Sequence, residues 1–313
     1  MFKNMYENDI SVHGGVPKQF YHLKSKEFTE WEIAPWELII DTDKLLGHGN
    51  WANVYLAEWR KTTVVAKVLK NNLDVHAKHL IIKEFNNMTK MHHPNIVQLF
   101  GYIEEPFVIV MEYFQNGDLY KNLNKLSLKQ KIKITNDIIK GIIYIHERKP
   151  IGLIHRDLKL RNILLTNSYT AKIGDFGLST FAIDNIIKTT SNNDLSNLEC
   201  NRDNNEILDL TNNVGTERYM APEIRTNNYN NKVDIYSCGI LLLELFTTKL
   251  YIHDWITKYS KLNNHFIKLI NEMISISPNT RPSAMVVLSR FNKINFLKTS
   301  ILKSFIKLKL KGY

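Results

Sequence analysis

The hydrophobic pattern of this chain changes near residues 113–118, from the alternation typical of strands to the spacing typical of helices. Before that point, β-rich runs separated by turn signals lie at Leu38–Ile40, Val54–Trp59, Thr63–Val68, Ile96–Tyr102 and Phe107–Tyr113, with one helical stretch at about 73–91. After it, an apolar residue recurs every three or four positions, at Ile134, Ile138, Ile142 and Ile145. This order predicts a strand-rich lobe followed by a helix-rich lobe.

Length and composition agree with a folded protein of one large domain or two lobes. The chain has 313 residues, of which 44% are hydrophobic and 23% charged, and this composition excludes wholesale disorder. Cysteine occurs only twice, at Cys200 and Cys238, so a disulfide framework is excluded and a reducing compartment is favoured.

Neither a membrane span nor a secretory signal is predicted. The longest apolar stretch, Cys238–Phe246, is about half the length that a transmembrane helix needs, and it carries Glu244. Residues 1–15 contain charged residues and glycines and lack the apolar region of a signal peptide. We therefore expect a soluble, intracellular protein in the cytoplasm.

A formal net charge of +10 could indicate nucleic acid or an anionic membrane as a partner, but a solvated Lys-rich surface is favoured. Nucleic-acid binding is therefore not predicted. The tail at 297–313 interleaves lysines with apolar residues at helical spacing. A terminal helix packed on the domain is the favoured interpretation, and the alternative is a weak contact with a membrane surface.

A glycine-rich segment, Leu46–Val54, lies between two predicted strands. Glycines allow a backbone to approach phosphates closely with its N–H groups turned inward, although many such turns bind nothing. Lys67 follows in an apolar strand, where an ammonium needs a partner because burying it unpaired costs several kcal/mol. Glu84, in the following helical stretch, is the natural partner.

The second lobe carries a denser set of chemical groups. His155–Asn162 places a carboxylate, an ammonium and a carboxamide in one short loop, and Asp175-Phe176-Gly177 follows about one hairpin later. The oxygens of Asn162 and Asp175 suit Mg²⁺, which takes few protein ligands and keeps several waters. Asp157 is left to accept a hydroxyl proton, and Lys159 to neutralise charge on a phosphoryl group.

In this order and at these intervals, the segments resemble eukaryotic-type protein kinases over about residues 36–290. Further matches are Ala221-Pro222-Glu223, Asp234 and Arg281. Within that family the chain is most similar to the tyrosine-kinase-like group, whose members mostly modify Ser and Thr. The resemblance implies an α+β, bilobal protein-kinase fold. Its N-lobe would be a small antiparallel sheet with one main helix, and its larger C-lobe would be mainly α-helical.

The resemblance also implies boundaries along the chain. They are an N-terminal extension at 1–35, the N-lobe at 36–113, the C-lobe at 114–296 and the tail at 297–313. The stretch at 182–213 is an extended insert in the activation segment, and it contains Thr189, Thr190, Ser191, Ser196 and Thr211. In the family, the residue at Arg156 commonly clamps a phosphorylated residue of this segment, so regulation through it is expected.

By resemblance, each match acquires a role in binding ATP and Mg²⁺, with Mn²⁺ as an alternative ion. Lys67 would orient the phosphates and be held by Glu84, Asp157 would be the catalytic base beside Lys159, and Asn162 and Asp175 would bind the metal. The other nucleotide-binding positions are Gly47, His48, Gly49 and Asn50 for the phosphates, Val54, Ala66 and Leu164 around adenine, Glu112 and Phe114 through their backbone, and Asp118 on the ribose. Glu223 and Arg281 would form a buried structural ion pair.

The resemblance favours an ATP-dependent kinase of protein Ser/Thr residues. Lys159 and the segment Gly215–Met220 are of the Ser/Thr type, while dual specificity stays open. The alternative is a pseudokinase that binds nucleotide and acts as a scaffold or switch. Protein substrates and nucleotide are the expected partners, and the oligomeric state is open.

Overall fold

The computed structural model describes residues 29–49, 51–70, 82, 85–181, 217–226, 229–247 and 264–294. The chain divides into two compact units, an N-terminal unit of residues 1–115 and a C-terminal unit of residues 116–313. The predicted insert at 182–213, the tail at 297–313 and most of the helical stretch at 73–91 lie outside the described residues.

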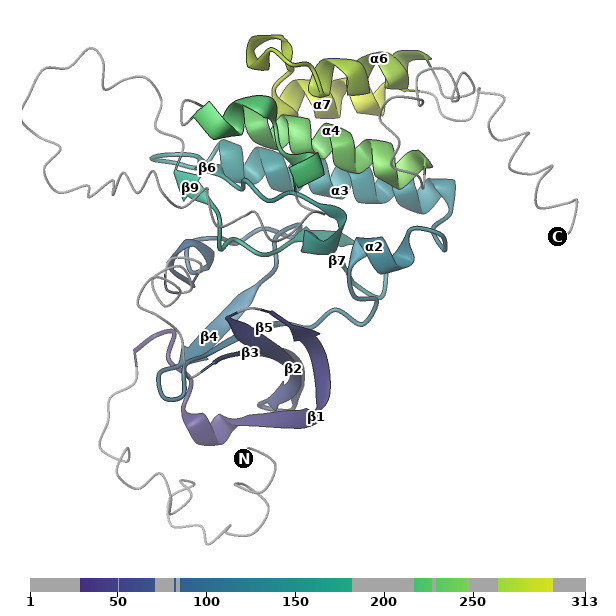
Figure 1. The fold of residues 1–313 in the computed structure, drawn as a ribbon. Coiled ribbons are helices and arrows are strands. Elements are labelled where there is room, and N and C mark those ends of the chain that lie inside the picture. Colours follow the sequence, from purple (N-terminus) through teal and green to yellow (C-terminus); the bar gives the residue numbers. More distant parts are fainter. Residues whose placement is uncertain are drawn as a thin grey trace, which may run out of the picture. The chain divides into compact units, whose positions relative to one another are not determined.

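The N-terminal unit is built on a five-stranded antiparallel sheet with the strand order β1-β2-β3-β5-β4 (Figure 1). Its strands are β1 (Leu38–His48), β2 (Ala52–Trp59), β3 (Thr62–Leu69), β4 (Leu99–Ile103) and β5 (Val108–Glu112). The turn between β2 and β3 is made by Arg60 and Lys61, both with positive φ, at the position where the sequence predicts a turn. The predicted strand-rich part is therefore confirmed.

Most strand boundaries differ from the prediction by one or two residues, and two differ by three or more. The first strand was predicted to end at Ile40 but runs to His48, because it continues to pair with β2 up to the pair His48–Asn53. The fourth strand begins at Leu99 instead of Ile96, because the amide of Ile96 donates to the carbonyl of His93 (3.0 Å) and so belongs to the preceding turn. Strand pairing sets the end of β1, and a turn hydrogen bond sets the start of β4. Neither contact can be predicted from the hydrophobic periodicity of the sequence.

One face of the sheet forms the core of the N-terminal unit. Its buried members alternate along the strands and include Val64, Ala66 and Val68 of β3. The segment before β1 covers this core: Ile33 is buried, and its amide donates to the carbonyl of Tyr102 in β4 (2.7 Å). A Cβ at Gly101 would lie 2.5 Å from the carbonyl oxygen of Trp31, so this close approach requires glycine.

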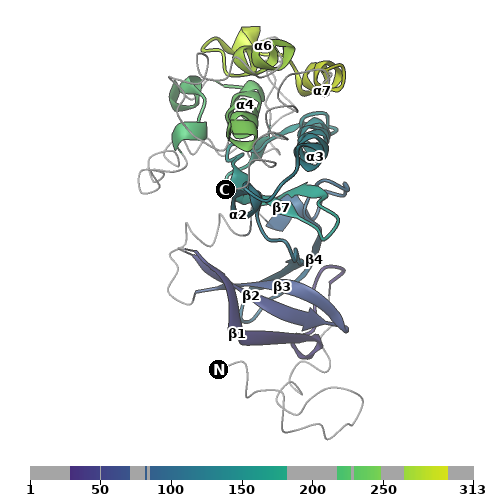
Figure 2. The same cartoon turned by 90° about the vertical axis from the view of Figure 1, so that its right-hand side faces the viewer.

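The described part of the C-terminal unit contains four longer helices and one short one. They are α2 (Leu119–Asn122), α3 (Leu128–His146), α4 (Lys232–Thr247), α6 (Asn264–Met273) and α7 (Ala284–Asn292). In α3 the isoleucines with helical spacing are all buried, which confirms the predicted helix. Helices α3 and α4 lie side by side, and Figure 2 views them nearly along their axes.

Short strands and 3₁₀ helices position the polar segments between α3 and α4. Strand β6 (Leu153–Ile154) pairs with β9 (Thr180–Phe181), and β7 (Ile163–Leu165) forms a hairpin with β8 (Ala171–Ile173). Between the same two helices, 3₁₀ helices lie at Leu160–Asn162, Glu217–Tyr219 and Pro222–Thr226, and a further one at Pro278–Thr280 follows α6. Asp137 on α3 fixes the hairpin, since its carboxylate accepts from the amide of Ala171 (3.1 Å).

Over the described ranges, no helix combines the length and the apolar character that crossing a bilayer demands.

Candidate active site

The face of the sheet opposite the core carries the predicted lysine. Val54 pairs with Lys67, and Val65 lies two residues before Lys67, so all three side chains share one face. Met111 pairs with Val65 and joins them. This apolar face, with one ammonium on it, is the part of the N-terminal unit suited to hold a flat ring next to phosphates.

Ala66 does not lie on this face, which corrects its assignment beside Val54. It is fully buried in the core on the opposite side, because side chains alternate along a strand and Ala66 is the neighbour of Lys67. Val65 is the β3 residue that shares the face with Val54. Counting back two residues from Lys67 in the sequence would have found it.

The glycine-rich segment forms the hairpin turn between β1 and β2. Gly47 pairs with Val54, and the amide of Gly49 donates to the carbonyl of Ala52 (2.9 Å). His48 pairs with Asn53, and its Nε2 lies 3.4 Å from the Nζ of Lys70. Asn50 lies outside the described residues, and so does Glu84, the expected partner of Lys67.

In the C-terminal unit, Asp157 is the centre of the polar cluster. Its Oδ2 accepts from the Nζ of Lys159 (2.7 Å) and from the Nδ2 of Asn162 (2.9 Å). Its Oδ1 is fully buried and has no hydrogen-bond partner among the described residues. A buried acceptor without a partner costs about 1–3 kcal/mol, so this atom is poised to accept a hydrogen bond from a ligand.

Burial is the main cause that raises the pKa of Asp157, and the negative charge of Asp175 adds to it. Lys159 is the main opposing influence: it lowers the pKa through its charge and its hydrogen bond. Asp157 is therefore a stronger base than an ordinary, exposed aspartate.

Asn162 and Asp175 meet at the open end of the β7–β8 hairpin. Ile163 pairs with Ile173, and the amide of Gly174 donates to the carbonyl of Asn162 (2.9 Å), which continues the pairing by one step. Asp175 follows directly, exposed and with positive φ. The hairpin therefore brings a carboxamide and a carboxylate from separate motifs to one end.

This donor set fits Mg²⁺, whose protein ligands are usually one or two carboxylate or amide oxygens besides water and substrate phosphates. Because the Nδ2 of Asn162 points to Asp157, the oxygen of the same amide faces away from it. Within the described ranges, no group of three or more His, Cys, Asp and Glu side chains could hold a metal by itself. An ion here would depend on phosphate oxygens for its remaining ligands.

A buried aspartate, Asp234, holds the backbone directly before Asp157. Asp234 accepts from the amides of His155 (2.8 Å) and Arg156 (2.9 Å) and contacts the Nε2 of His146 (2.9 Å). Burial opposes its charge, but the hydrogen bonds outweigh burial and lower the pKa of Asp234. Asp234 matches the family pattern in the sequence without a predicted role, and the structure places it as the support of the loop.

His155 and Phe176 link the loop to the segment that carries Asp175. Both are fully buried, with ring centroids 4.8 Å apart. The Nε2 of His155 is 3.0 Å from the carbonyl of Gly174, and its Nδ1 accepts from the amide of Asp157 (3.3 Å). The imidazole of His155 therefore contacts both the loop of Asp157 and the backbone directly before Asp175.

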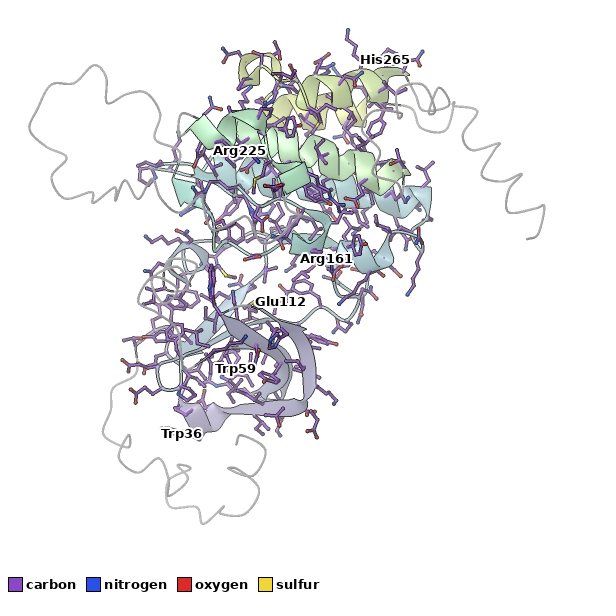
Figure 3. The ribbon with its side chains drawn as sticks, viewed as in Figure 1. Trp36, Trp59, Glu112, Arg161, Arg225 and His265 are labelled. Atoms are coloured by element: carbon purple, nitrogen blue, oxygen red, sulfur yellow. The ribbon has the colours of Figure 1, made fainter. Side chains whose placement is uncertain are left out.

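The remaining nucleotide-binding candidates fall into the two units. Asp118 and Leu164 form an isolated antiparallel bridge in the C-terminal unit, and the carboxylate of Asp118 also caps α2 by accepting from the amide of Lys121 (2.9 Å). Glu112, labelled in Figure 3, ends β5. Phe114 lies two residues later in the N-terminal unit. In the C-terminal unit, the guanidinium of Arg161 lies 4.4 Å from the ring centroid of Tyr120.

Comparison with known proteins identifies the family. The protein kinase domain family matches this chain over residues 40–291. The chain belongs to the protein kinase family. The predicted similarity to the tyrosine-kinase-like group and the bilobal α+β kinase fold are confirmed with it.

Individual relatives of this kinase domain share about a third of its residues. Serine/threonine-protein kinase VIK of Arabidopsis thaliana is 34% identical over 69% of this chain and 48% of its own length. Serine/threonine-protein kinase CTR1 of the same plant is 33% identical over 68% of this chain and 24% of its own length. Dual specificity protein kinase pyk3 of Dictyostelium discoideum is 34% identical over 78% of this chain and 16% of its own length. The chain thus spans half or less of these relatives.

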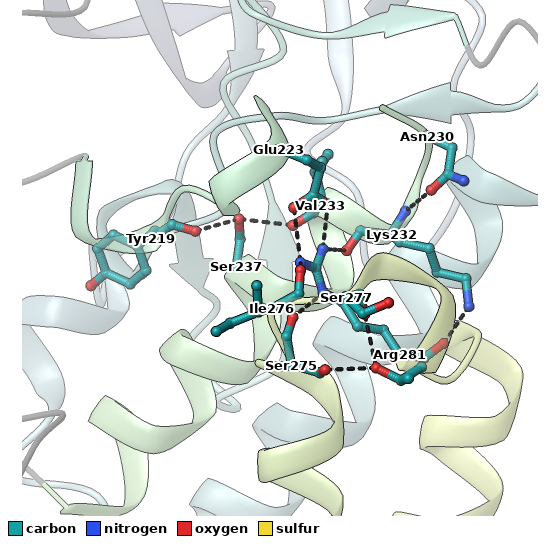
Figure 4. Close-up of polar contacts among 11 residues, drawn as sticks. Tyr219, Glu223, Asn230, Lys232, Val233, Ser237, Ser275, Ile276, Ser277 and Arg281 are labelled. Carbon is teal, nitrogen blue, oxygen red and sulfur yellow. Dashed lines mark hydrogen bonds and ion pairs between the residues drawn. The ribbon is translucent and has the colours of Figure 1, made fainter. Parts of the chain in front are cut away.

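The predicted ion pair of the kinase domain is present and buried. Arg281 is 1% exposed, and its NH2 donates to the Oε2 of Glu223 (2.8 Å). The same guanidinium donates to three backbone carbonyls, those of Lys232 (3.0 Å), Ser275 (2.8 Å) and Ile276 (3.3 Å) (Figure 4). Arg281 therefore joins the segment of Glu223 to the start of α4 and to the loop after α6.

Sequence reasoning missed Asp137 and Tyr229 as well as Val65. Asp137 lies among the buried isoleucines of α3, and an acid in an apolar stripe is a signal that it anchors something. Tyr229, in the loop before α4, belongs to no recognisable sequence pattern. Only the fold brings its hydroxyl within hydrogen-bond distance of Arg156.

Proposed function

We propose that this domain transfers the γ-phosphoryl group of ATP to Ser and Thr hydroxyls of protein substrates. The observation that carries the proposal is the state of Asp157: one carboxylate oxygen is held by Lys159 and Asn162, and the other is buried without a partner among the described residues. A base that receives a substrate hydroxyl needs such an oriented, unoccupied oxygen.

In the proposed reaction, the Oδ1 of Asp157 accepts the hydrogen bond, and then the proton, of the substrate hydroxyl. The hydroxyl oxygen forms a bond to the γ-phosphorus, the bond from that phosphorus to the bridging β–γ oxygen breaks, and ADP leaves. The ammonium of Lys159, held by Asp157, neutralises charge on the transferred group. Positioning supplies most of the rate enhancement in such reactions.

We propose Asn162 and Asp175 as the residues that hold Mg²⁺, with Mn²⁺ as an alternative. The bound ion would neutralise charge on the nucleotide phosphates. Lys67, held by Glu84, would bind the α- and β-phosphates, and the amides of residues 47–50 would line the phosphate chain. Val54, Val65 and Leu164 would contact adenine, the backbone of Glu112 and Phe114 would hydrogen-bond it, and Asp118 would bind the ribose.

The specificity for Ser and Thr is tested by identifying the phosphorylated residue. We expect the purified chain, given Mg²⁺ and labelled ATP, to phosphorylate a generic basic protein and itself. Hydrolysis of the labelled proteins should then release phosphoserine and phosphothreonine. The names of the relatives VIK and CTR1 support this result, and that of pyk3 keeps dual specificity as the competing outcome. Phosphotyrosine as the main product would contradict the proposal.

A pseudokinase would give a different pair of results. If ATP with Mg²⁺ raises the melting temperature of the chain but no acceptor, including the chain itself, gains phosphate, the pseudokinase reading replaces this proposal. Intact-mass analysis before and after incubation with Mg²⁺ and ATP measures the gain directly.

The pH dependence of transfer should report Asp157 and its neighbour Lys159. Because the carboxylate must be deprotonated to accept a proton, activity falls as the pH drops through the pKa of Asp157, which burial raises. Lys159 lowers that pKa, so Lys159→Ala should reduce kcat and also move the acid limb of the kcat profile to higher pH.

The matched control for this profile is Lys133→Ala. Lys133 also pairs with an aspartate, Asp137 (3.2 Å), on α3, and it is not among the groups that shift the pKa of Asp157. Its removal should leave the acid limb in place. An unmoved limb in Lys159→Ala, or equal movement in both variants, would show that the limb does not report Asp157.

This function needs protein substrates and nucleotide as partners. Regulation through residues 182–213, a weak membrane contact of the tail at 297–313 and a cytoplasmic location stay predictions, and both segments lie outside the described residues.

A further inference from the structure

Arg156 precedes Asp157, and the proposed reaction does not use its guanidinium. Its backbone has positive φ (67°), and its amide donates to the Oδ1 of Asp234 (2.9 Å). The Nε of the side chain donates to the carbonyl of Leu178, and NH1 donates to the hydroxyl of Tyr229 (2.8 Å). Among the described residues, no carboxylate forms an ion pair with Arg156.

These two acceptors belong to different parts of the unit. Leu178 lies three residues after Asp175, the proposed metal ligand, whereas Tyr229 lies in the loop before α4. The guanidinium of Arg156 therefore connects the backbone beside the proposed base with the segment of Asp175. Such a planar group, with several fixed donors, is suited to join segments in one geometry.

Tyr229 itself is held in place by packing. Its half-buried ring contacts a buried cluster of Ile154, Ala221 and Val233, which come from β6, the segment before Glu223 and α4. The ring cannot leave without uncovering this cluster, so its hydroxyl stays where NH1 of Arg156 meets it. A hydrogen bond to a charged donor is among the stronger ones in proteins.

We propose that Tyr229 is a positioning residue, which holds Arg156 and thereby the loop of Asp157 against the segment of Asp175 without a phosphate group. This inference rests on the proposed function and refines its regulation: a phosphate in residues 182–213 is not needed to fix Arg156. The hydroxyl of Tyr229 and the carbonyl of Leu178 already occupy two of its donors.

The test compares Tyr229→Phe with the wild-type chain after phosphatase treatment, with intact mass confirming that no phosphate remains. Initial rates are measured at short times with Mg²⁺ and ATP. We expect the wild type to keep its kcat within about twofold of the untreated protein. Dephosphorylated Tyr229→Phe should lose roughly tenfold in kcat, the factor of one hydrogen bond to a charged group, with the KM for ATP changed less than about twofold.

Tyr236→Phe is the matched control, because Tyr236 packs against the same cluster but contacts Arg281 through its ring instead of Arg156. It should keep the wild-type kcat with and without phosphatase. A merely structural role for Tyr229 would lower the melting temperature and affect both variants alike. Equal kcat in Tyr229→Phe and Tyr236→Phe, or a tenfold loss in the dephosphorylated wild type, would overturn the proposal.

Hydrogen exchange separates this proposal from the proposed function. If the wild type transfers no phosphate at all, the proposed function fails, yet the contact can still be measured in the chain without ATP. Amides of residues 174–181 should exchange faster in Tyr229→Phe than in the wild type and in Tyr236→Phe. Unchanged exchange there would overturn the role of Tyr229 whether or not the chain is active.

Discussion

Replacing Asp157 by Asn should reduce phosphoryl transfer by at least about 100-fold, since a general base contributes about 10²–10⁴-fold. The amide has the shape of the carboxylate, and its oxygen can still accept from Lys159, so the loop should keep its structure. The NH2 group of Asn then takes the place of the unpartnered Oδ1, and it cannot take up the proton of a hydroxyl. Initial rates of transfer from labelled ATP measure the loss, and thermal melting with ATP and Mg²⁺ measures whether nucleotide still binds.

A control with the same chemistry is Asp137→Asn. Asp137 is also buried, but its carboxylate holds the hairpin by accepting from the amide of Ala171, and an amide oxygen can do the same. This variant should transfer phosphate within about a few-fold of the wild type. Equal rates in Asp157→Asn and the wild type would remove Asp157 from the reaction and leave the proposed function without its base.

Replacing Arg281 by Met should lower the free energy of unfolding of the chain by about 3–5 kcal/mol, the cost of breaking a buried ion pair. Met fills much of the same volume but removes the guanidinium that binds Glu223 and takes its donors away from three backbone carbonyls. Urea unfolding followed by far-UV circular dichroism measures the change, because the helices of the C-terminal unit dominate that signal.

Arg290→Met is the comparison that isolates burial. Arg290 also forms a two-point pair with a glutamate, Glu272, but both side chains are about one third exposed. Water and salt weaken such a pair, so its loss should change stability by about 1 kcal/mol or less. Similar decreases in the free energy of unfolding in the two arginine variants would mean that burial does not determine how much the Arg281 pair stabilises the fold.

A second replacement gives a further check on the same pair. Adding Glu223→Leu to Arg281→Met also removes the carboxylate that has lost the guanidinium of Arg281, so the double variant should be more stable than Arg281→Met alone. Additive losses would instead indicate that Glu223 and Arg281 stabilise the fold through separate contacts.

Much of the fold was predictable because its signals are local. The strands of the N-terminal unit alternate in hydrophobicity, and α3 repeats its isoleucines every three or four residues, so neighbouring positions carry the information. The end of β1 was predicted wrongly, because the four residues after Ile40 are polar and interrupt the hydrophobic pattern, while the strand continues through its pairing with β2. No local pattern reports a partner strand.

The candidate site divides in the same way. The motif at 155–162 places Asp157, Lys159 and Asn162 within six residues, so their contacts follow from one short loop. Ala66 was assigned to the wrong face, although the alternation around Lys67 already pointed to Val65. That error came from matching a motif without applying the period of the strand.

The amino-acid sequence alone determined which chemical groups this protein carries, in which order, and that they belong to a kinase. Their motifs are short and continuous, so the identity of each residue is enough. Only the tertiary structure decided that Asp234 supports the loop of Asp157, that Arg281 also donates to the carbonyl of Lys232 at the start of α4, and that Tyr229 contacts Arg156. Each of these contacts joins segments at least 49 residues apart, and their geometry depends on how the chain packs between them.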